Sequence, residues 1–186
     1  MISIIFHFYE SEKSNIKYLI VNVRKVGKSM VNVVLTRIDD RLIHGQVMTS
    51  WVHFTAANSI VIVDDKVAKD DFLKSILNGL IPSGINLNIF NVDDGAKFLM
   101  GDDNGKNVII LVKTPGTVYR LLEEGVELKN LVIGGMGANR DRKKFYKNIS
   151  ASDEEKETIR KIIEKGVDVV IQIIPEDRAI NVKKLL

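Results

Sequence analysis

Apolar residues recur along this chain in short, nearly continuous runs, and segments with helical spacing separate them. The runs are rich in Val and Ile, as are strands buried on both faces of a parallel sheet. The predicted strands are 31–36, 59–63, 86–91, 107–112, 130–133 and 167–174. The predicted helices are 46–54, 69–80, 93–100, 116–124 and 153–165.

Local signals mark several of these helix ends. Ser152 followed by Glu155 matches a capping box at a helix start, and Gly125 and Gly166 stand where helix C-caps belong. Two shorter segments are assigned as well, an edge strand at 144–150 and a closing helix at 177–186.

Strands that alternate with helices are typical of an α/β fold. We predict an open, doubly wound, mostly parallel sheet of about six or seven strands with helices on both faces. Right-handed crossovers then bring the loops that follow the strands to one edge, where ligands bind in such sheets.

Residues 1–29 do not follow this alternation, because they mix apolar patches with Lys, Ser and Asn. We therefore predict an N-terminal extension at 1–29, outside the core, and one domain at 31–186. The alternative is that 16–23 adds an edge strand or an oligomer contact, which its β-branched content would suit.

Composition limits the class of protein. A chain of 186 residues with 45% apolar and 27% charged residues is ordinary for one soluble domain. The net charge of +3 is small and dispersed, which argues against nucleic acid as a partner. The exception is the basic cluster 140–147, which we interpret as a solvated loop beside an active site or as a docking face.

The chain has no cysteine, which excludes disulfides and thiolate metal sites and suits a reducing cytosol. No apolar run approaches the roughly 18–20 residues that span a bilayer. The apolar start lacks a basic region and a cleavage site, so it is a poor secretory signal.

His44 is the leading candidate for chemistry, since it lies where the strand 31–36 passes into the helix 46–54. A neutral imidazole is a competent nucleophile at cytosolic pH. Gly45 lets a phosphoryl group approach the backbone, and the helix that starts at Gln46 offers unpaired N–H donors. This surrounding favours a transferred phosphoryl group as the ligand.

Charged residues just before His44 complete this candidate site. Arg41 and Arg37 are candidate phosphate ligands, because guanidinium binds phosphate oxygens bidentately. Asp39 and Asp40 are suited to orient an arginine or the second nitrogen of the histidine. The alternative for each is a solvated charge in a turn.

Three other strand-end loops are open to two interpretations. The pair Asp64 and Asp65 is weak evidence for a metal site, and a turn that caps the next helix is favoured. Thr114 is a further candidate phosphate ligand, or only the boundary between a strand and a helix. The glycine loop 134–137 lacks both nucleotide-binding fingerprints and is interpreted as a tight loop beside the active site. No metal or cofactor is predicted.

Arg-Ile-Asp-Asp-Arg-Leu-Ile-His-Gly-Gln-Val at 37–47, followed by Trp51, resembles the phosphorylation-site signature of the IIB component in the mannose/fructose/sorbose family of sugar phosphotransferase systems. The segments 60–71, 132–136 and 150–154 are similar to further parts of that family, and together the resemblance covers 31 to about 180. The first 30 residues have no counterpart in a free-standing IIB protein. The segment 134–150 is more similar to the N-acetylgalactosamine branch.

The resemblance implies a cytoplasmic phosphoryl carrier that is peripherally associated with a membrane transporter. Such a carrier accepts a phosphoryl group from a IIA protein and passes it to a sugar held by membrane IIC and IID subunits. His44 matches the phosphorylated histidine, Arg41 the arginine that stabilises the phosphate, and Asp39 the aspartate that supports this arginine. Neither the sugar, nor the oligomeric state, nor the phosphorylated nitrogen follows from the sequence.

Two rival functions remain. A response-regulator receiver domain, phosphorylated on aspartate, also has acids and a lysine at strand ends, but it leaves the Arg41–His44 arrangement unexplained. A nucleotide-binding enzyme would use the glycine loops, but the phosphate fingerprints are missing.

Overall fold

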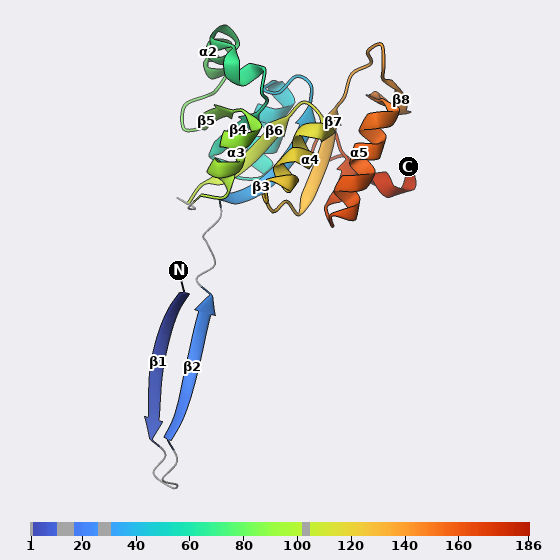
Figure 1. The fold of residues 1–186 in the computed structure, drawn as a ribbon. Coiled ribbons are helices and arrows are strands. Elements are labelled where there is room, and N and C mark those ends of the chain that lie inside the picture. Colours follow the sequence, from blue (N-terminus) through green and yellow to red (C-terminus); the bar gives the residue numbers. More distant parts are fainter. Residues whose placement is uncertain (1, 11–16, 26–30, 102–104) are drawn as a thin grey trace.

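A seven-stranded sheet forms the centre of the molecule (Figure 1). The computed structural model describes residues 2–10, 17–25, 31–101 and 105–186, the first two ranges by their backbone only. The strand order is β11-β10-β7-β3-β6-β4-β5. All neighbours in it pair in parallel except β10 and β11, which are antiparallel. The strands are β3 (Asn32–Asp39), β4 (Ser59–Val63), β5 (Asn86–Phe90), β6 (Asn107–Val112), β7 (Asn130–Gly135), β10 (Asp168–Ile171) and β11 (Ile180–Asn181). The predicted fold class is confirmed.

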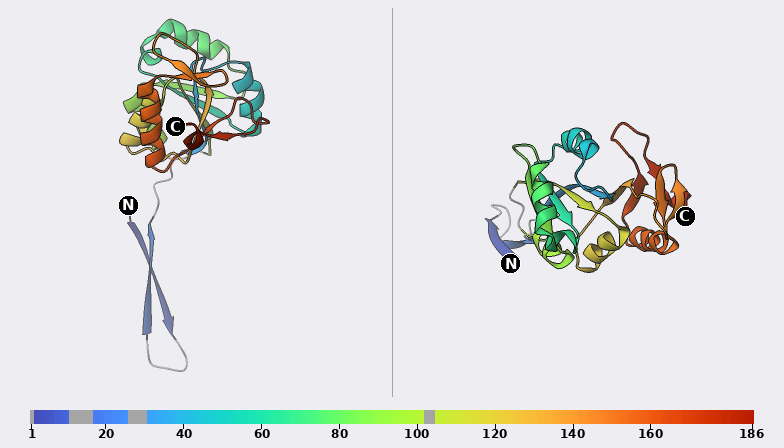
Figure 2. Two further views of the ribbon diagram at one scale, coloured as in Figure 1. Left: turned by 90° about the vertical axis from the view of Figure 1, so that its right-hand side faces the viewer. Right: turned by 90° about the horizontal axis from the view of Figure 1, so that it is seen from above.

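Helices cover both faces of this sheet, and Figure 2 shows them on its two sides. The chain runs from β3 through β4 to the edge strand β5 and then reverses direction towards β6, β7 and β10. Because the crossovers are right-handed, this reversal moves the helices from one face to the other. The first face carries α1 (Val52–Phe54) and α2 (Asp71–Gly79), and the second carries α3 (Val92–Leu99), α4 (Pro115–Glu123) and α5 (Asp153–Glu164).

The strands are buried on both faces, as their apolar runs predict. In β6, Val108, Ile110 and Val112 pack with the α3–α5 side, while Ile109 and Leu111 pack with the α1–α2 side. This alternation is the two-residue period of a strand. It explains why the runs are apolar throughout.

The helix ends agree with the local signals. Ser152 and Glu155 form a complete capping box at the start of α5. Gly125 and Gly166 both have φ of 91°, in the left-handed region that ends helices and favours glycine. The helix predicted at 46–54 is present with a wide turn inside it, the π-helical segment η1 (Val47–Trp51), which leads into α1. A short 3₁₀ turn, η2 (Val67–Lys69), precedes α2.

Several predicted elements need correction. The strand predicted at 167–174 ends earlier, because β10 stops at Ile171. Strand β3 continues three residues beyond the predicted end at Thr36, because it pairs with β6 as far as Ile38 and with β7 as far as Asp39. The segment 144–150 belongs to a separate hairpin, β8 (Lys143–Tyr146) with β9 (Ile149–Ala151), and is not an edge strand of the main sheet. The closing helix predicted at 177–186 is wrong, since the chain ends in β11 and a 3₁₀ turn, η3 (Val182–Lys184).

The N-terminal segment contains two strands, β1 (Ile2–Glu10) and β2 (Lys17–Lys25), which pair antiparallel with each other. They form their own two-stranded sheet, separate from the seven-stranded one. The segment 17–23 is thus part of a strand, but this strand pairs with β1 and not with the edge of the main sheet. The alternative of an oligomer contact stays a prediction. The boundary between an extension at 1–29 and a domain at 31–186 stays a prediction.

Candidate functional site

Asp39, the last residue of β3, is the centre of a cluster of positive and potentially positive side chains. Its carboxylate is fully buried and accepts hydrogen bonds from Arg37, Arg41 and His44. Burial alone would raise the pKa of the Asp39 carboxyl, but hydrogen bonds from Arg41 and His44 and the charge of Arg37 lower it to about 2. Asp39 is therefore a carboxylate at any physiological pH.

His44 and Arg41 approach this carboxylate from the turn that follows β3. Nε2 of His44 lies 3.0 Å from Oδ2 of Asp39, and the His44 side chain is 15% exposed. Nε of Arg41 donates to Oδ1 at 2.9 Å and Nη2 donates to Oδ2 at 3.1 Å. The Arg41 side chain is 52% exposed, so its guanidinium is anchored on Asp39 and also open to solvent.

The backbone turn between Asp39 and His44 brings these groups together. The N–H of Leu42 donates to the carbonyl of Asp39, and Leu42 has φ of 56°, a left-handed conformation that leucine rarely adopts. Its side chain is buried in the core beside Ile43. Packing therefore stabilises a turn that directs His44 back towards Asp39.

Gly45 and Gln46 follow His44 as the first helical residues, so the helix begins one residue before the predicted start at Gln46. Oε1 of Gln46 lies 3.5 Å from Nη2 of Arg41, which places Gln46 beside the same guanidinium. A Cβ atom at Gly45 would meet nothing within 4 Å, so the exposed glycine leaves open space next to His44.

Arg37 does not fit the prediction that it binds phosphate. Its side chain is fully buried, because β3 extends through it and central strands are covered on both faces. Nη2 donates to Asp39 and to the carbonyl of Ile173, and Nη1 donates to the carbonyl of Gln172. We therefore reassign Arg37 as a buried support for Asp39.

Trp51 is a supporting residue to which sequence reasoning gave no role. Its indole N–H donates to the carbonyl of Ile173 at 3.0 Å, the same carbonyl that Arg37 contacts. The guanidinium carbon of Arg37 lies 5.2 Å from the centre of the Trp51 ring, within range of a cation–π contact. The only sequence signal for this role was that Trp51 follows the motif at 37–47.

Two glycines at the end of β7 make room for the cluster. A Cβ atom on Gly134 would overlap the Arg37 guanidinium, and one on Gly135 would lie 2.5 Å from Oδ1 of Asp39. The two glycines therefore let β7 pass close to these side chains. The interpretation of 134–137 is right in placing these residues beside the site, but Gly134 and Gly135 belong to β7 and are not part of a loop.

Arg142 changes the interpretation of the basic cluster 140–147. Its side chain is only 7% exposed and bonds to Asp40 at 2.7 Å and to Glu155 at 2.6 Å. Arg140 and Lys143 in the same segment are exposed. The cluster thus combines one ion-paired arginine, whose side chain is nearly buried, with solvated cations.

The remaining candidates have structural partners. Oγ1 of Thr114 accepts from the N–H of Thr117 as the N-cap of α4, so we assign it no contact with the His44 cluster. Oδ1 of Asp64 accepts from the N–H groups of Lys66 and Val67, which supports the turn interpretation. Among the described residues, no group of three or more histidine and acidic side chains is arranged to hold a metal ion.

A shallow pocket of about 300 Å³ lies beside the cluster. Its walls come from the turn after β3, the glycine loop and the hairpin β8–β9. The lining residues are Asp39, Asp40, Arg41, Gln46, Gly134, Gly135, Met136, Gly137, Asn148 and Ile173. A phosphoryl group near Arg41 would therefore meet backbone groups of the glycine loop.

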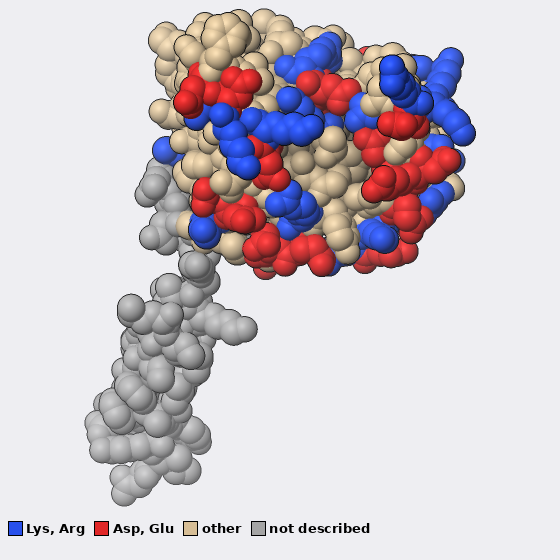
Figure 3. Space-filling model, turned by 45° about the horizontal axis from the view of Figure 1, so that its top comes forward, with Lys and Arg blue, Asp and Glu red and all other residues tan. Residues whose placement is uncertain are grey.

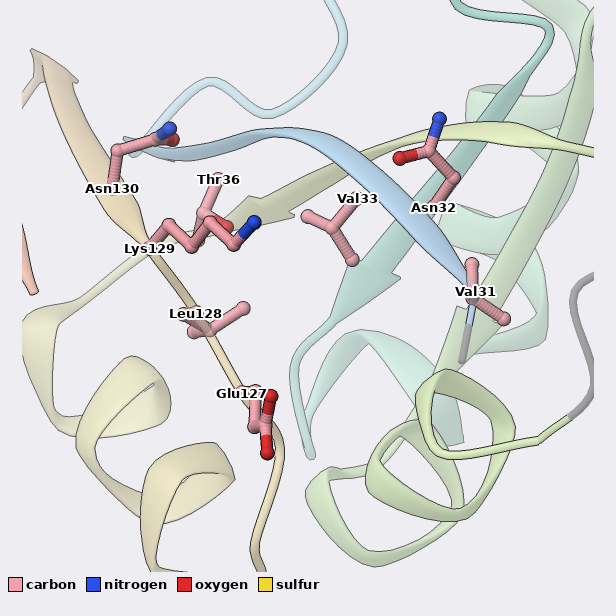
Figure 4. Close-up of a pocket in the computed structure, with 8 residues that line it drawn as sticks. All are labelled: Val31, Asn32, Val33, Thr36, Glu127, Leu128, Lys129 and Asn130. Carbon is pink, nitrogen blue, oxygen red and sulfur yellow. The ribbon is translucent and has the colours of Figure 1, made fainter. Parts of the chain in front are cut away.

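A second pocket, of about 320 Å³, opens between the amino ends of β3 and β7 (Figure 4). These strands pair only from Arg37 and Val132 onwards, so their earlier residues diverge. Val33 and Leu128 lie on its two sides. The pocket is at the opposite end of β3 from His44, and no predicted site residue lines it.

The surface charges are mixed on the face that Figure 3 shows, where acidic and basic side chains alternate over the described residues. A continuous basic stripe, the usual footprint of a nucleic-acid surface, is not seen on that face of the described chain. Within the described ranges, each helix is too short or too polar to cross a membrane.

Comparison with known sequences matches residues 33–186 to a family described as the PTS system sorbose subfamily IIB component. The fructose-specific EIIB component of Bacillus subtilis (strain 168) is 31% identical over 84% of this chain and 97% of its own length. The N-acetylgalactosamine-specific IIB component 1 of Escherichia coli (strain K12) is 32% identical over 79% of this chain and 94% of its own.

Solved structures agree with this match. The crystal structure of the Escherichia coli N-acetylgalactosamine-specific IIB component 1 covers 80% of this chain and 97% of that one, with a TM-score of 0.76. The manxB structure from Thermoanaerobacter tengcongensis is 36% identical, covers 83% of this chain and 95% of that one, and has a TM-score of 0.76.

These matches rule out the two alternatives, a receiver domain and a nucleotide-binding enzyme. The family model spans the seven-stranded sheet except for the first residue of β3, and it includes the whole His44 cluster. The chain therefore belongs to the sorbose subfamily of IIB components of the sugar phosphotransferase system, and its activity is phosphoryl transfer in sugar uptake.

Proposed function

We propose that His44 accepts a phosphoryl group from a phosphorylated IIA protein and that this group then passes to a sugar held by membrane IIC and IID subunits. The main observation in support is the contact between Nε2 of His44 and the buried Asp39 carboxylate. A carboxylate accepts hydrogen bonds only, so Nε2 carries the proton in this pair. The lone pair of the neutral imidazole is then on Nδ1, the nitrogen available as nucleophile.

Asp39 has two roles in this proposal. It fixes the orientation of the imidazole, and its negative charge stabilises the positive charge that the ring gains when Nδ1 bonds to phosphorus. The Asp39 carboxylate keeps its own charge throughout, because its pKa is about 2. The aspartate of hydrolase catalytic triads acts in the same way, since it orients the histidine without taking its proton.

Arg41 is the proposed ligand of the transferred phosphoryl group. Its bonds to Asp39 use Nε and Nη2, and the half-exposed guanidinium also lines the adjacent pocket. A guanidinium near the phosphoryl oxygens stabilises the charge that spreads over them during transfer. The backbone near Gly45 and Gln46 is the second proposed contact for these oxygens.

The exposure of the cluster suits a carrier that meets two partners in turn. His44 and Arg41 reach the surface, while Asp39 and Arg37 below them are fully buried. A phosphoryl donor can therefore approach from outside while the support remains rigid. The protein would act in the cytoplasm at the membrane subunits. The relatives are named for different sugars, so the N-acetylgalactosamine branch stays a prediction.

The test is to incubate the protein with phosphorylated cognate IIA and to map the adduct by mass spectrometry at alkaline pH. We expect phosphate on His44 in the wild type and none in the His44→Ala variant. His53 is exposed on α1 of the same helical run, so His53→Ala is the matched control and should accept phosphate normally. An alkali-labile phosphate on Asp39, or normal phosphorylation of the His44→Ala variant by IIA, would contradict the proposal.

A further inference from the structure

Arg142 is the most completely bonded cation of the described chain next to the site. Nε and Nη2 donate hydrogen bonds to the carboxylate of Glu155 at 2.6–3.0 Å. The third nitrogen, Nη1, donates to Oδ2 of Asp40 at 2.7 Å and to the carbonyl of Gly137 at 3.2 Å. All three guanidinium nitrogens are thus engaged in a side chain that is only 7% exposed.

Both carboxylates that Arg142 contacts are themselves fixed. Glu155 is the third residue of α5 and forms the capping box with Ser152, so it is anchored to the start of a twelve-residue helix. Asp40 accepts the N–H of Gly137 at 2.7 Å, and its own N–H donates to the carbonyl of Gly135. Arg142 therefore connects α5, the glycine loop and the turn after β3.

Asp40 lies between Asp39 and Arg41 in the chain, so its position sets the backbone from which both of these side chains extend. The Arg41 side chain is half exposed, and the Arg41 N–H donates to Oδ1 of Asp39 at 3.3 Å. Asp40 restrains the same turn a second time, through its bonds to Gly135, Gly137 and Arg142. A bidentate guanidinium–carboxylate pair gives geometric specificity that a lysine does not provide.

We propose that Arg142 is a positioning residue for phosphoryl transfer, because through Asp40 it holds the Asp39–Arg41 turn in the geometry that His44 requires. This inference rests on the proposed function of His44 as the phosphoryl acceptor. It assigns Arg142 to the interior of the site, whereas Arg140 and Lys143 are exposed on the surface.

The test compares Arg142→Gln with Arg140→Gln, a matched loss of one positive charge in the same loop at an exposed position. Single-turnover transfer from phosphorylated IIA gives a maximal rate and a half-saturating IIA concentration. We expect Arg142→Gln to lower the maximal rate at least tenfold with the half-saturating concentration within twofold of wild type. Arg140→Gln should keep the maximal rate.

Asp40→Asn removes the same link from its other end. The double variant Asp40→Asn/Arg142→Gln should be no more than about twofold slower than the slower single variant, because coupled residues are not additive. Arg142→Lys keeps the charge without the planar fork, and we expect it to lie between wild type and Arg142→Gln. It also serves as the test if Arg142→Gln fails to fold.

A second measurement separates this inference from the proposed function. The ¹⁵N chemical shift of Arg41 Nε in the resting protein reports the turn without any transfer, and it should change in Arg142→Gln but not in Arg140→Gln. If wild type takes no phosphate on His44, the proposed function fails, and the Arg41 shift still reports separately whether Arg142 holds the Asp39–Arg41 turn. A folded Arg142 variant, Gln or Lys, with a wild-type maximal rate and an unchanged Arg41 shift would overturn the inference.

Discussion

Oδ2 of Asp39 lies 3.0 Å from Nε2 of His44, and the same oxygen accepts bonds from Arg37 and Arg41. One fully buried carboxylate oxygen thus joins the candidate nucleophile, the candidate phosphate ligand and a buried arginine beneath them. Because the oxygen only accepts, the geometry determines which imidazole nitrogen keeps its proton.

The first prediction concerns the site of phosphorylation within the ring. We expect the phosphoryl group on Nδ1 of His44, because Nε2 is occupied by the proton shared with Asp39. Two-dimensional ¹H–¹⁵N spectra of the phosphorylated protein, recorded at alkaline pH, distinguish the two nitrogens by their coupling to the ring protons. Phosphate on Nε2 would show that the contact with Asp39 breaks before transfer.

The second prediction concerns Arg41. A charge-assisted contact contributes about 1.5–3 kcal/mol, so Arg41→Ala should slow single-turnover transfer roughly ten- to a hundredfold. Arg41→Lys should recover part of the rate, since an ammonium keeps the charge without the fork. The measurement is made at matched folding stability, and an alanine variant within twofold of wild type would remove Arg41 from the mechanism.

The third prediction uses the low pKa of Asp39. The pKa of the Asp39 carboxyl is about 2 in the folded state and near 4 in the unfolded state. The ionised carboxylate therefore stabilises the fold fully above about pH 4, and this stabilisation is lost as the pH falls towards 2. The unfolding free-energy gap between wild type and Asp39→Asn should therefore narrow by about 1 kcal/mol from pH 6 to pH 3. Urea titrations at both pH values measure it, and a gap that widens on acidification would contradict the assigned direction.

The fourth prediction concerns the close approach of β7 to the cluster. Gly134→Ala would push a methyl group into the buried Arg37 guanidinium, so we expect a loss of about 3 kcal/mol in unfolding free energy. Gly79→Ala is the control, because a Cβ atom there meets nothing within 4 Å. Equal melting temperatures for the two variants would mean that the Arg37 side chain can move aside without loss of stability.

The fifth prediction concerns the N-terminal extension. All strands of the seven-stranded sheet begin after residue 30, and β1 pairs with β2 alone. A chain that starts at Met30 should therefore fold and transfer phosphate as the full chain does. Melting temperature, oligomer mass and transfer rate are compared, and a melting point more than about 5 °C lower would assign residues 1–29 to the fold.

The alternation of strands and helices could be read from the sequence because it depends on local periodicity and local capping. Strands β4 and β6 have their predicted bounds, and the capping box at Ser152 is present as expected. Apolar runs and caps act over a few residues, so their signal survives without tertiary information. The motif around His44 was visible for the same reason, since Asp39, Arg41 and His44 are neighbours in the chain.

The tertiary structure decided which charges are buried. Arg37 and Arg41 look alike in sequence, but the pairing of β3 with β6 and β7 buries the first and leaves the second half exposed. Arg142 is likewise indistinguishable from Arg140 until α5 brings Glu155 to it. These roles depend on partners that are distant in sequence, whose approach is set by strand order and helix packing, and no local pattern encodes that approach.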